Sequence, residues 1–502
     1  MFAPVPSRHP PPTAAAIEAD DRRPTGHRVR LMTSAQMYAR LLASDASCNG
    51  RFFFGVQTTG IYCLPSCRAR KPRRENVRFF PTVEAARAAG LRACRKCHPD
   101  DFARGADPVL EQIETLAAEV RTTPSAFADV PALVRRSGFG ATRLFEFFRQ
   151  HFHTTPAEYL LRARLEAAKF QLLQSDATVA EIAYTVGFET LSAFHENFRR
   201  LNGLTPASYR ALRNARAFTV ALPENYPLPY LKRALSRDPQ SLTERLTGDT
   251  YHACVRLDGA PARIAVELRP DELRVMLPAG SATTAHALIV GLAGLTQDAP
   301  AFARLAKRLG FARLVAGREN LRISQTPSVF DGLVWAVIGQ QINFAFACVL
   351  KRRLTELVST EFADGLYAPP TPDAIARLDP AQLLPLQFSR QKADYLINVS
   401  RLVASGQLDL AALPSQSALR AERTLLAVRG LGPWSVNYLL MRSLGFLDCV
   451  PLGDTGVTSG LQTLFRLDHR PERDETVQLM RAFSPYRSLA TTHLWQLDRP
   501  LP

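Results

Sequence analysis

The sequence predicts a multidomain, mainly α-helical protein that also contains a small cysteine-bearing α/β domain and a second α/β domain built on an antiparallel sheet. Three observations support this fold class. The 502 residues suggest about three or four domains. Short amphipathic stretches with helical periodicity run from about 108 to 212 and again from about 300 to the C-terminus. Between them, residues 216–280 alternate apolar and polar positions, as half-buried strands do.

Composition restricts the partners and the environment. The formal net charge of +16 favours a polyanionic partner, most often nucleic acid, although a basic enzyme with an unrelated substrate remains an alternative at this point. No segment has the pattern of a signal peptide and no apolar run approaches the length of a membrane span, so we expect a cytoplasmic protein without a membrane partner. The eight cysteines are then expected to be reduced thiols.

Two close cysteine pairs dominate the first folded segment. Residues 1–30 are rich in Pro, Ala and Arg and predict a disordered tail, and a domain of about 31–105 follows. It contains a C-x3-C pair, twenty-six intervening residues and a C-x2-C pair, formed by Cys63, Cys67, Cys94 and Cys97. This spacing suits one tetrahedral Zn²⁺ held by four thiolates, and the second pair argues against a thioredoxin-like redox site.

The basic surroundings of the cysteines indicate more than a structural staple. Four thiolates on Zn²⁺ carry a net charge of about −2 and keep their sulfurs nucleophilic. Nearby cations could offset that charge and hold a DNA backbone: Arg68, Arg70, Lys71, Arg73, Arg74, Arg92, Arg95 and Lys96. A thiolate beside a methylated phosphate could take the methyl group by direct displacement, and the lost negative charge would tighten DNA binding. A plain zinc staple remains the alternative.

The stretches "FFFGVQTTGIYCLPSCRARKPRRENVRFF" and "LRACRKC" closely resemble the N-terminal zinc domain of the Ada adaptive-response proteins, over about residues 34–100. The resemblance implies that Zn²⁺ is the cofactor and that Cys63 accepts methyl groups from methylphosphotriesters in DNA. It also implies that Thr59, Arg70 and Arg92 lie near the phosphate. The second methyltransferase domain of that family, with its Pro-Cys-His-Arg motif, has no counterpart in the sequence.

An internal repeat marks the next domain, about 106–215. "SGFGATRLFEFFRQHFHTTPAEYL" and "VGFETLSAFHENFRRLNGLTPASYR" align at a period of about fifty residues and predict two helix-turn-helix units, with recognition helices over about 141–150 and 191–201. The segment resembles the AraC-type DNA-binding domain. Any single exposed residue could be an ordinary solvated one, but these are the expected DNA contacts: Thr142, Arg143, Glu146, Leu191, Ser192, His195 and Glu196 at bases, and Arg199 and Arg200 at phosphates.

The stretch "LLAVRGLGPWSVNYLLMRSLGFLDCVPLGDTGV" predicts a helix, a tight hairpin and a second helix. Gly430 and Gly432 permit the turn and let backbone amides approach a phosphate. With Asp454 some two dozen residues later, the pattern resembles the helix-hairpin-helix DNA glycosylases, and "GLGPWSVNY" and "THLWQLD" resemble the AlkA-like 3-methyladenine glycosylases. The resemblance implies an α/β domain over 216–300 and an all-α glycosylase domain over 301–502.

The glycosylase resemblance implies hydrolysis of the N-glycosylic bond of alkylated purines such as 3-methyladenine and 7-methylguanine. The Asp454 carboxylate would stabilise the oxocarbenium-like sugar and orient or activate the water. Trp434 stands where bifunctional relatives carry a Schiff-base lysine, so a monofunctional enzyme without strand cleavage is expected. Asp448 is a second carboxylate in the same stretch, for which we expect a surface or helix-capping role.

The base must leave the stack before it can be excised. Alkylated purines carry positive charge, so aromatic rings select them by cation–π contacts of about 0.5–2 kcal/mol each. The positions that match the family's pocket are Trp434, Tyr438 and Trp495, with Gln340 also lining it, although core packing is the alternative for any buried aromatic. "VIGQQINFA" matches the loop that enters the vacated base site, and Gln341 takes the place of the expected apolar wedge.

Three functions are consistent with these motifs: a fusion of an Ada-type sensor and activator with an alkylbase glycosylase, a regulator with an inactive glycosylase half, and a glycosylase with a purely structural zinc domain. The combination of Asp454, Trp434 and Trp495 argues against the second, and the surroundings of Cys63 argue against the third. The sequence therefore predicts the fusion, working in the bacterial cytoplasm at the nucleoid. Its partners would be methylated double-stranded DNA, promoter DNA and RNA polymerase.

Overall fold

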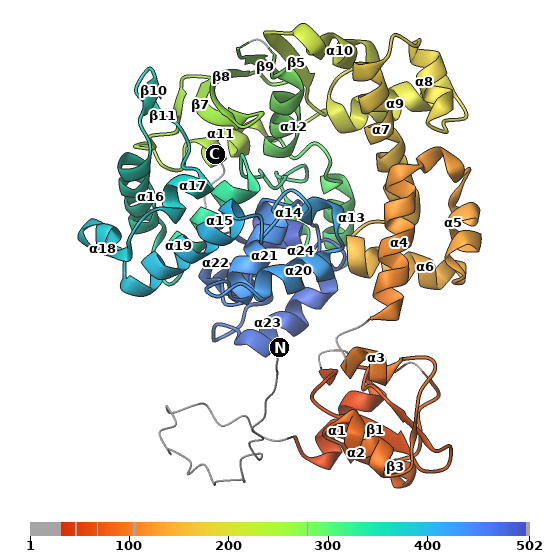
Figure 1. Cartoon of the computed structure of the whole chain (residues 1–502). Coiled ribbons are helices and arrows are strands. Elements are labelled where there is room, and N and C mark those ends of the chain that lie inside the picture. Colours follow the sequence, from red (N-terminus) through yellow and green to blue (C-terminus); the bar gives the residue numbers. More distant parts are fainter. Residues whose placement is uncertain (1–31, 46–47, 68, 104–106, 279, 498–502) are drawn as a thin grey trace, which may run out of the picture. The chain divides into compact units, whose positions relative to one another are not determined.

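The computed structural model confirms the mainly helical, multidomain fold and divides into two compact units, Met1–Glu111 and Gln112–Pro502 (Figure 1). It describes residues 32–45, 48–67, 69–103, 107–278 and 280–497. The predicted tail at 1–30 and Arg68 lie outside these residues. Among the described helices, none combines the length and the apolar character that a membrane span requires.

The first unit is a small four-stranded sheet with short helices. Its strands are in the order β3-β1-β2-β4, in which β1 pairs antiparallel with β2 and β3 while β4 runs parallel to β2. Its elements are α1 (Ser34–Leu42), β1 (Phe53–Val56), β2 (Ile61–Cys63), β3 (Val77–Phe80), α2 (Val83–Ala88), β4 (Arg92–Ala93) and α3 (Pro99–Ala103). The parallel pairing is what brings the two cysteine pairs to one place.

Two helix-turn-helix units follow, as the repeat predicts, joined by the long helix α7. In both units a threonine before a proline caps the helix after the recognition helix: Thr155 accepts the N–H of Glu158, and Thr205 that of Ser208. The helices are α4 (Pro108–Thr122), α5 (Val130–Ser137), α6 (Ala141–Phe152), α7 (Pro156–Gln174), α8 (Val179–Thr185), α9 (Leu191–Asn202) and α10 (Pro206–Ala211). Helices α6 and α9 are the expected recognition helices.

The second helix-turn-helix unit and the following α/β domain share one hydrophobic core, which runs across the predicted boundary between residues 215 and 216. The Ala221 N–H donates to the carbonyl of Gly203, directly after α9. The five antiparallel strands have the order β5-β9-β8-β7-β6. The elements are β5 (Ala217–Ala221), α11 (Leu228–Leu235), β6 (Glu244–Thr247), β7 (Thr250–Leu257), β8 (Ala260–Leu268), β9 (Glu272–Met276) and α12 (Ala282–Leu292).

The C-terminal domain packs its helices around a separate apolar core, to which α15, α19, α21 and α24 contribute. A two-stranded sheet, β10–β11, interrupts a region for which the sequence predicts helices alone. The elements are α13 (Ala299–Arg308), α14 (Ala312–Val315), α15 (Val329–Ile338), α16 (Phe344–Val358), β10 (Glu361–Ala363), β11 (Leu366–Tyr367), α17 (Pro372–Ala376), α18 (Pro380–Leu383), α19 (Arg390–Ala404), α20 (Ala418–Leu426), α21 (Pro433–Arg442), α22 (Thr455–Phe465), α23 (Arg473–Met480) and α24 (Arg487–Leu494).

Candidate functional sites

The four predicted metal ligands form one cluster. Cys63 ends β2, Cys67 follows in the next turn, and Cys94 and Cys97 follow β4, which lies beside β2. Their Sγ atoms all lie within 4.8 Å of one another. Tetrahedral Zn²⁺ with Zn–S bonds of about 2.3 Å places its sulfurs about 3.8 Å apart, so the donor set fits that ion.

Backbone and lysine contacts hold the loops that carry the sulfurs. The Leu64 N–H donates to Cys97 Sγ at 3.4 Å. Lys71 donates to the Cys67 carbonyl at 2.7 Å and to Ser44 Oγ at 2.6 Å, and burial lowers its pKa. Lys71 therefore supports the loop that carries Cys63 and Cys67. The sequence predicts for it only the role of a cation that offsets the charge of the cluster.

The residues expected near a phosphate are exposed, whereas the expected methyl acceptor is only 4% exposed. Thr59 lies in the turn between β1 and β2, where its hydroxyl donates to the Val56 carbonyl at 3.4 Å. Arg92 begins β4, beside β2, and Arg70 follows the first cysteine pair. A phosphate held by these side chains would have to come close to the cluster for Cys63 to be reached.

Helices α6 and α9 present most of the predicted base and phosphate contacts to solvent. These exposed residues are Thr142, Arg143, Glu146, Ser192, His195, Glu196, Arg199 and Arg200. Leu191 differs, because it is half-buried and packs against the shared core. Arg200 also has partners within the protein, with Glu158 at 3.5 Å and Asn197 at 3.2 Å.

The hairpin between α20 and α21 depends on one glycine more than on the other. Gly430 has φ +101°, and a Cβ built on it would lie 2.4 Å from Cγ of Tyr395 in α19. Gly432 is the N-cap of α21 with φ −93°, and a Cβ there meets nothing within 4 Å. Only glycine therefore fits at position 430, whereas position 432 is open to contact from outside.

Two tryptophans hold the predicted catalytic carboxylate. Asp454 is the N-cap of α22, and its Oδ1 accepts the Val457 N–H at 3.0 Å. The Trp495 indole N–H donates to Oδ1 at 2.9 Å, and the Trp434 indole N–H donates to Oδ2 at 3.2 Å. Three N–H donors thus fix the orientation of a half-buried carboxylate. Residues 41 and 20 positions away from Asp454 meet at one group.

The predicted base-pocket aromatics line one cavity with this carboxylate. The cavity has a volume of about 450 Å³, within the range of small-ligand sites. The rings of Trp434 and Tyr438 are stacked with centroids 5.5 Å apart. The α/β domain and α16 complete the wall, where the Arg237 guanidinium lies 4.3 Å from the ring centroid of Phe344.

The two glutamines after α15 have different surroundings. Gln341 is exposed, and its backbone has φ +55°, a conformation that residues other than glycine rarely adopt. Gln340 is not among the described residues that line the cavity; its amide donates to the Gly430 carbonyl at 2.8 Å and to Ser435 Oγ at 3.0 Å. Gln340 ties the loop to the hairpin.

Models of three protein families match the chain: "Metal binding domain of Ada" over 36–100, "Helix-turn-helix domain" over 133–212, and "HhH-GPD superfamily base excision DNA repair protein" over 334–485. A probable bifunctional transcriptional activator/DNA repair enzyme AlkA of Mycobacterium tuberculosis is 28% identical, over 92% of this chain and 96% of its own.

Two relatives from Bacillus subtilis each match part of the chain. The bifunctional transcriptional activator/DNA repair enzyme AdaA is 31% identical, over 37% of this chain and 89% of its own. The DNA-3-methyladenine glycosylase is 34% identical, over 40% of this chain and 68% of its own. The chain belongs to the family of bifunctional transcriptional activator/DNA repair enzymes. It joins an Ada-type regulatory half to an AlkA-type glycosylase half, as the motifs predict.

In this family member, Asp448 belongs to a buried junction and is not a surface residue. It is 8% exposed and pairs with Arg487 at 2.7 Å. Burial opposes its charge, but the hydrogen bonds and the charge of Arg487 hold the pKa of Asp448 below its usual value. Its carboxylate also accepts the N–H of Arg487, the first residue of α24, so the expected capping role is present.

The same junction docks the first helix-turn-helix unit onto the glycosylase domain. His153, just after α6, accepts the backbone N–H of Asp448 on Nδ1 at 3.1 Å, and burial lowers its pKa to about 4. Glu114 of α4 accepts the N–H of Ser417, the N-cap of α20, at 2.9 Å, and lies 3.2 Å from Arg420 in the first turn of that helix. Sequence patterns carry no indication of these contacts, because the partners are about 300 residues apart.

Proposed function

We propose that Cys63 is the residue that accepts methyl from a DNA methylphosphotriester. Its Sγ attacks the methyl carbon; the S–C bond forms as the C–O bond breaks, and the electron pair leaves on the oxygen of a restored phosphodiester. Zn²⁺ bound by the four cysteines would keep their sulfurs deprotonated. Thr59, Arg70 and Arg92 hold the phosphate in this proposal, and each protein molecule reacts once.

The methyl transfer then acts as a switch for transcription. A methylated Cys63 removes one negative charge from the cluster, which reduces its repulsion of DNA phosphates. Promoter DNA is bound by α6 and α9 through their exposed faces, and RNA polymerase is the partner that the activated complex recruits. In this proposal these events take place in the bacterial cytoplasm, at the nucleoid.

The glycosylase half excises alkylated purines such as 3-methyladenine and 7-methylguanine in our proposal. The flipped base enters the cavity lined by Trp434, Tyr438 and Trp495, where the rings favour its positive charge. Asp454 stabilises the positive charge on the sugar as the N-glycosylic bond breaks, and water completes the hydrolysis. Gln341, exposed in its strained loop, occupies the space that the base leaves. No lysine takes part, so the strand stays intact.

The observation that carries the glycosylase assignment is the carboxylate held by two indole N–H groups at the wall of an aromatic cavity. It is tested with DNA methylated by a radiolabelled methyl donor, incubated with the full chain. Label is counted on the protein and as free base. We expect Asp454→Asn to abolish the free methylpurine while Asp373→Asn, a change at an exposed carboxylate in α17, leaves it unaltered.

The sensor assignment is tested in the same reaction. Peptide mass spectrometry of the wild-type protein should find the added methyl on Cys63, and Cys63→Ala should lose the label while Cys348→Ala keeps it. Methylation should also tighten promoter binding in a gel-shift titration. Methyl found on another residue, or an affinity that does not change, would contradict the sensor. Free base without label on the protein would leave the cysteines a zinc staple.

A further inference from the structure

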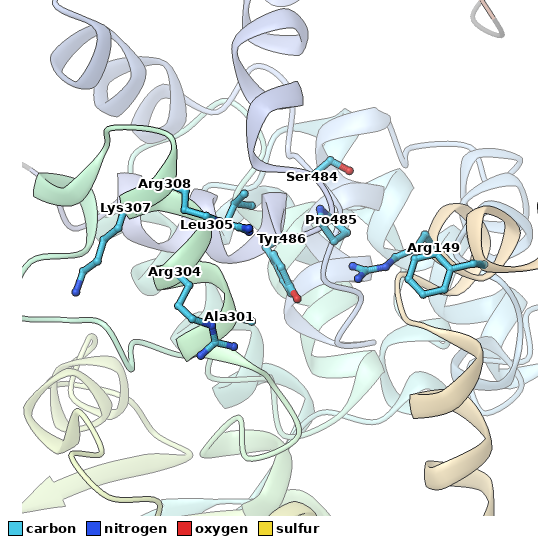
Figure 2. Close-up of a pocket in the computed structure, with 10 residues that line it drawn as sticks. Arg149, Ala301, Arg304, Leu305, Lys307, Arg308, Ser484, Pro485 and Tyr486 are labelled. Carbon is cyan, nitrogen blue, oxygen red and sulfur yellow. The ribbon is translucent and has the colours of Figure 1, made fainter. Parts of the chain in front are cut away.

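A second cavity lies between α6 of the first helix-turn-helix unit and the glycosylase domain. It is an open groove of about 820 Å³, away from the aromatic cavity. Figure 2 shows Tyr486 and Pro485 between the α13 residues on one side and Arg149 of α6 on the other. The lining residues are Phe145, Arg149, Ala301, Arg304, Leu305, Lys307, Arg308, Ser484, Pro485 and Tyr486.

The charge of this groove is entirely positive. Four of its ten lining residues are cationic and none is acidic. Lys307 has a carboxylate partner, Glu319 at 3.2 Å. Within the described part of the chain, no hydrogen bond or ion pair engages the side chain of Arg304 or Arg308, and both residues are exposed. Cations gathered without neutralising partners repel one another, so an anionic ligand in the groove would relieve that repulsion.

The groove continues the face of α6 that is expected to read DNA. Thr142, Glu146 and Arg149 are spaced i, i+4 and i+7 along the helix, which places them on one side. Arg149 is therefore both the end of the predicted reading face and one wall of the groove. A helix in the major groove has a phosphate backbone on either side of it, about 12 Å apart. The cations of α13 line the same groove as Arg149, so they are available to one of those backbones.

We propose that this groove binds the phosphodiester backbone of duplex DNA, so that the glycosylase domain extends the DNA-binding surface of the first helix-turn-helix unit. Arg304 and Arg308 bind phosphates next to the segment that α6 reads, and Arg149 binds the same backbone from the other wall. The docking of α6 through His153 keeps the two walls together. The proposal rests on the proposed function only in requiring that α6 bind DNA.

The test is the salt dependence of DNA binding by the full chain. Fluorescence anisotropy would follow an unmethylated duplex of about 30 base pairs over about 50 to 200 mM NaCl. Each lost phosphate contact reduces the magnitude of the negative slope of log K against log salt by about 0.9, so Arg304→Gln with Arg308→Gln should reduce it by about 1.8. Over that fourfold range of salt, the variant's loss of affinity should be about 12-fold smaller than that of the wild type.

The matched control is Arg274→Gln with Arg377→Gln, which removes the same charge from exposed sites in β9 and after α17. Its slope should stay close to that of the wild type. Adding Arg149→Gln to the groove variant should reduce the magnitude of the slope by about one more. Equal slopes for the groove and control variants would overturn the proposal. So would binding of a mononucleotide such as dAMP through these arginines with an unchanged duplex slope, since the groove would then be a small-ligand site.

A failure of this proposal can be told apart from a failure of the proposed function. Methyl transfer and base release are measured on the same preparations at low salt. If both persist and Arg143→Gln weakens binding while the groove variant does not, only the groove assignment is wrong. If Arg143→Gln has no effect either, the role of α6 in DNA binding is wrong.

Discussion

The hairpin glycine provides a quantitative test of the fold that supports the glycosylase site. In Gly430→Ala, the alanine must adopt φ +101°, which costs about 1–2 kcal/mol. Its Cβ would also lie 2.4 Å from Cγ of Tyr395, the fixed base of the ring and not its mobile end, so α19 must shift. Overpacking of this kind costs about 1–3 kcal/mol. The free energy of unfolding should therefore fall by about 2–5 kcal/mol.

The assay uses the positions of the tryptophans. All three lie between residues 335 and 495, so their fluorescence during urea unfolding reports on the C-terminal helical domain alone. Gly432→Ala is the matched control: with ordinary φ and an open surrounding, it should cost less than about 1 kcal/mol. A double-mutant cycle with Tyr395→Ala should recover the part of the packing cost, about 1–3 kcal/mol in total, that comes from the ring, because the Tyr395 Cβ, 2.8 Å away, remains. Equal losses at the two glycines would refute this reasoning.

Two further predictions concern the Asp454 carboxylate and the buried ring of His153. Trp434→Phe removes an N–H donor to Asp454, and a hydrogen bond to a charged acceptor is worth about 1.5–3 kcal/mol, so single-turnover base release should slow about 10- to 100-fold. The control Trp335→Phe, in the same cavity wall, should change the rate little. Equal rates for the two variants would show that the Trp434 indole N–H does not position the carboxylate. His153 has a folded pKa of about 4, below its unfolded value, so its contribution to stability is full above about pH 6.5 and is lost as the pH falls toward 4. The stability difference between the wild type and His153→Asn should shrink over that range in urea titrations, and a difference independent of pH would mean that the ring does not accept the Asp448 N–H as a neutral group.

Local patterns were sufficient for the elements and for the residues that act within one motif. The predicted recognition helices at 141–150 and 191–201 correspond to α6 and α9, which are at most two residues longer, because the amphipathic repeat and the Thr-Pro starts are local features. The four cysteines form one cluster as their spacing predicts. The two-stranded sheet β10–β11 was missed, since short strands of two or three residues leave little periodicity to detect.

The surroundings of some residues could not be predicted from the sequence, because their hydrogen-bond partners are distant in the chain. Asp448 is expected to be a surface or capping residue; it accepts the first N–H of α24, but it is buried in an ion pair with Arg487. Gln340 is expected to line the base pocket, and in the structure its amide donates to the Gly430 carbonyl of the hairpin. In each case the side chain's partner was not adjacent in sequence, and packing decided which of several plausible hydrogen-bond partners lay within reach.

The sequence by itself thus determined the domain types and the four-cysteine cluster and predicts Asp454 as the catalytic carboxylate, because these depend on motifs of about thirty-five residues or fewer in which spacing dictates geometry. Only the tertiary structure decided that Trp434 and Trp495 both donate to Asp454, and that the second helix-turn-helix unit shares its core with the α/β domain. The same holds for the cationic groove between α6 and α13. These features join segments up to about 340 residues apart, as Phe145 and Tyr486 are in the groove, and only chain packing brings such segments together.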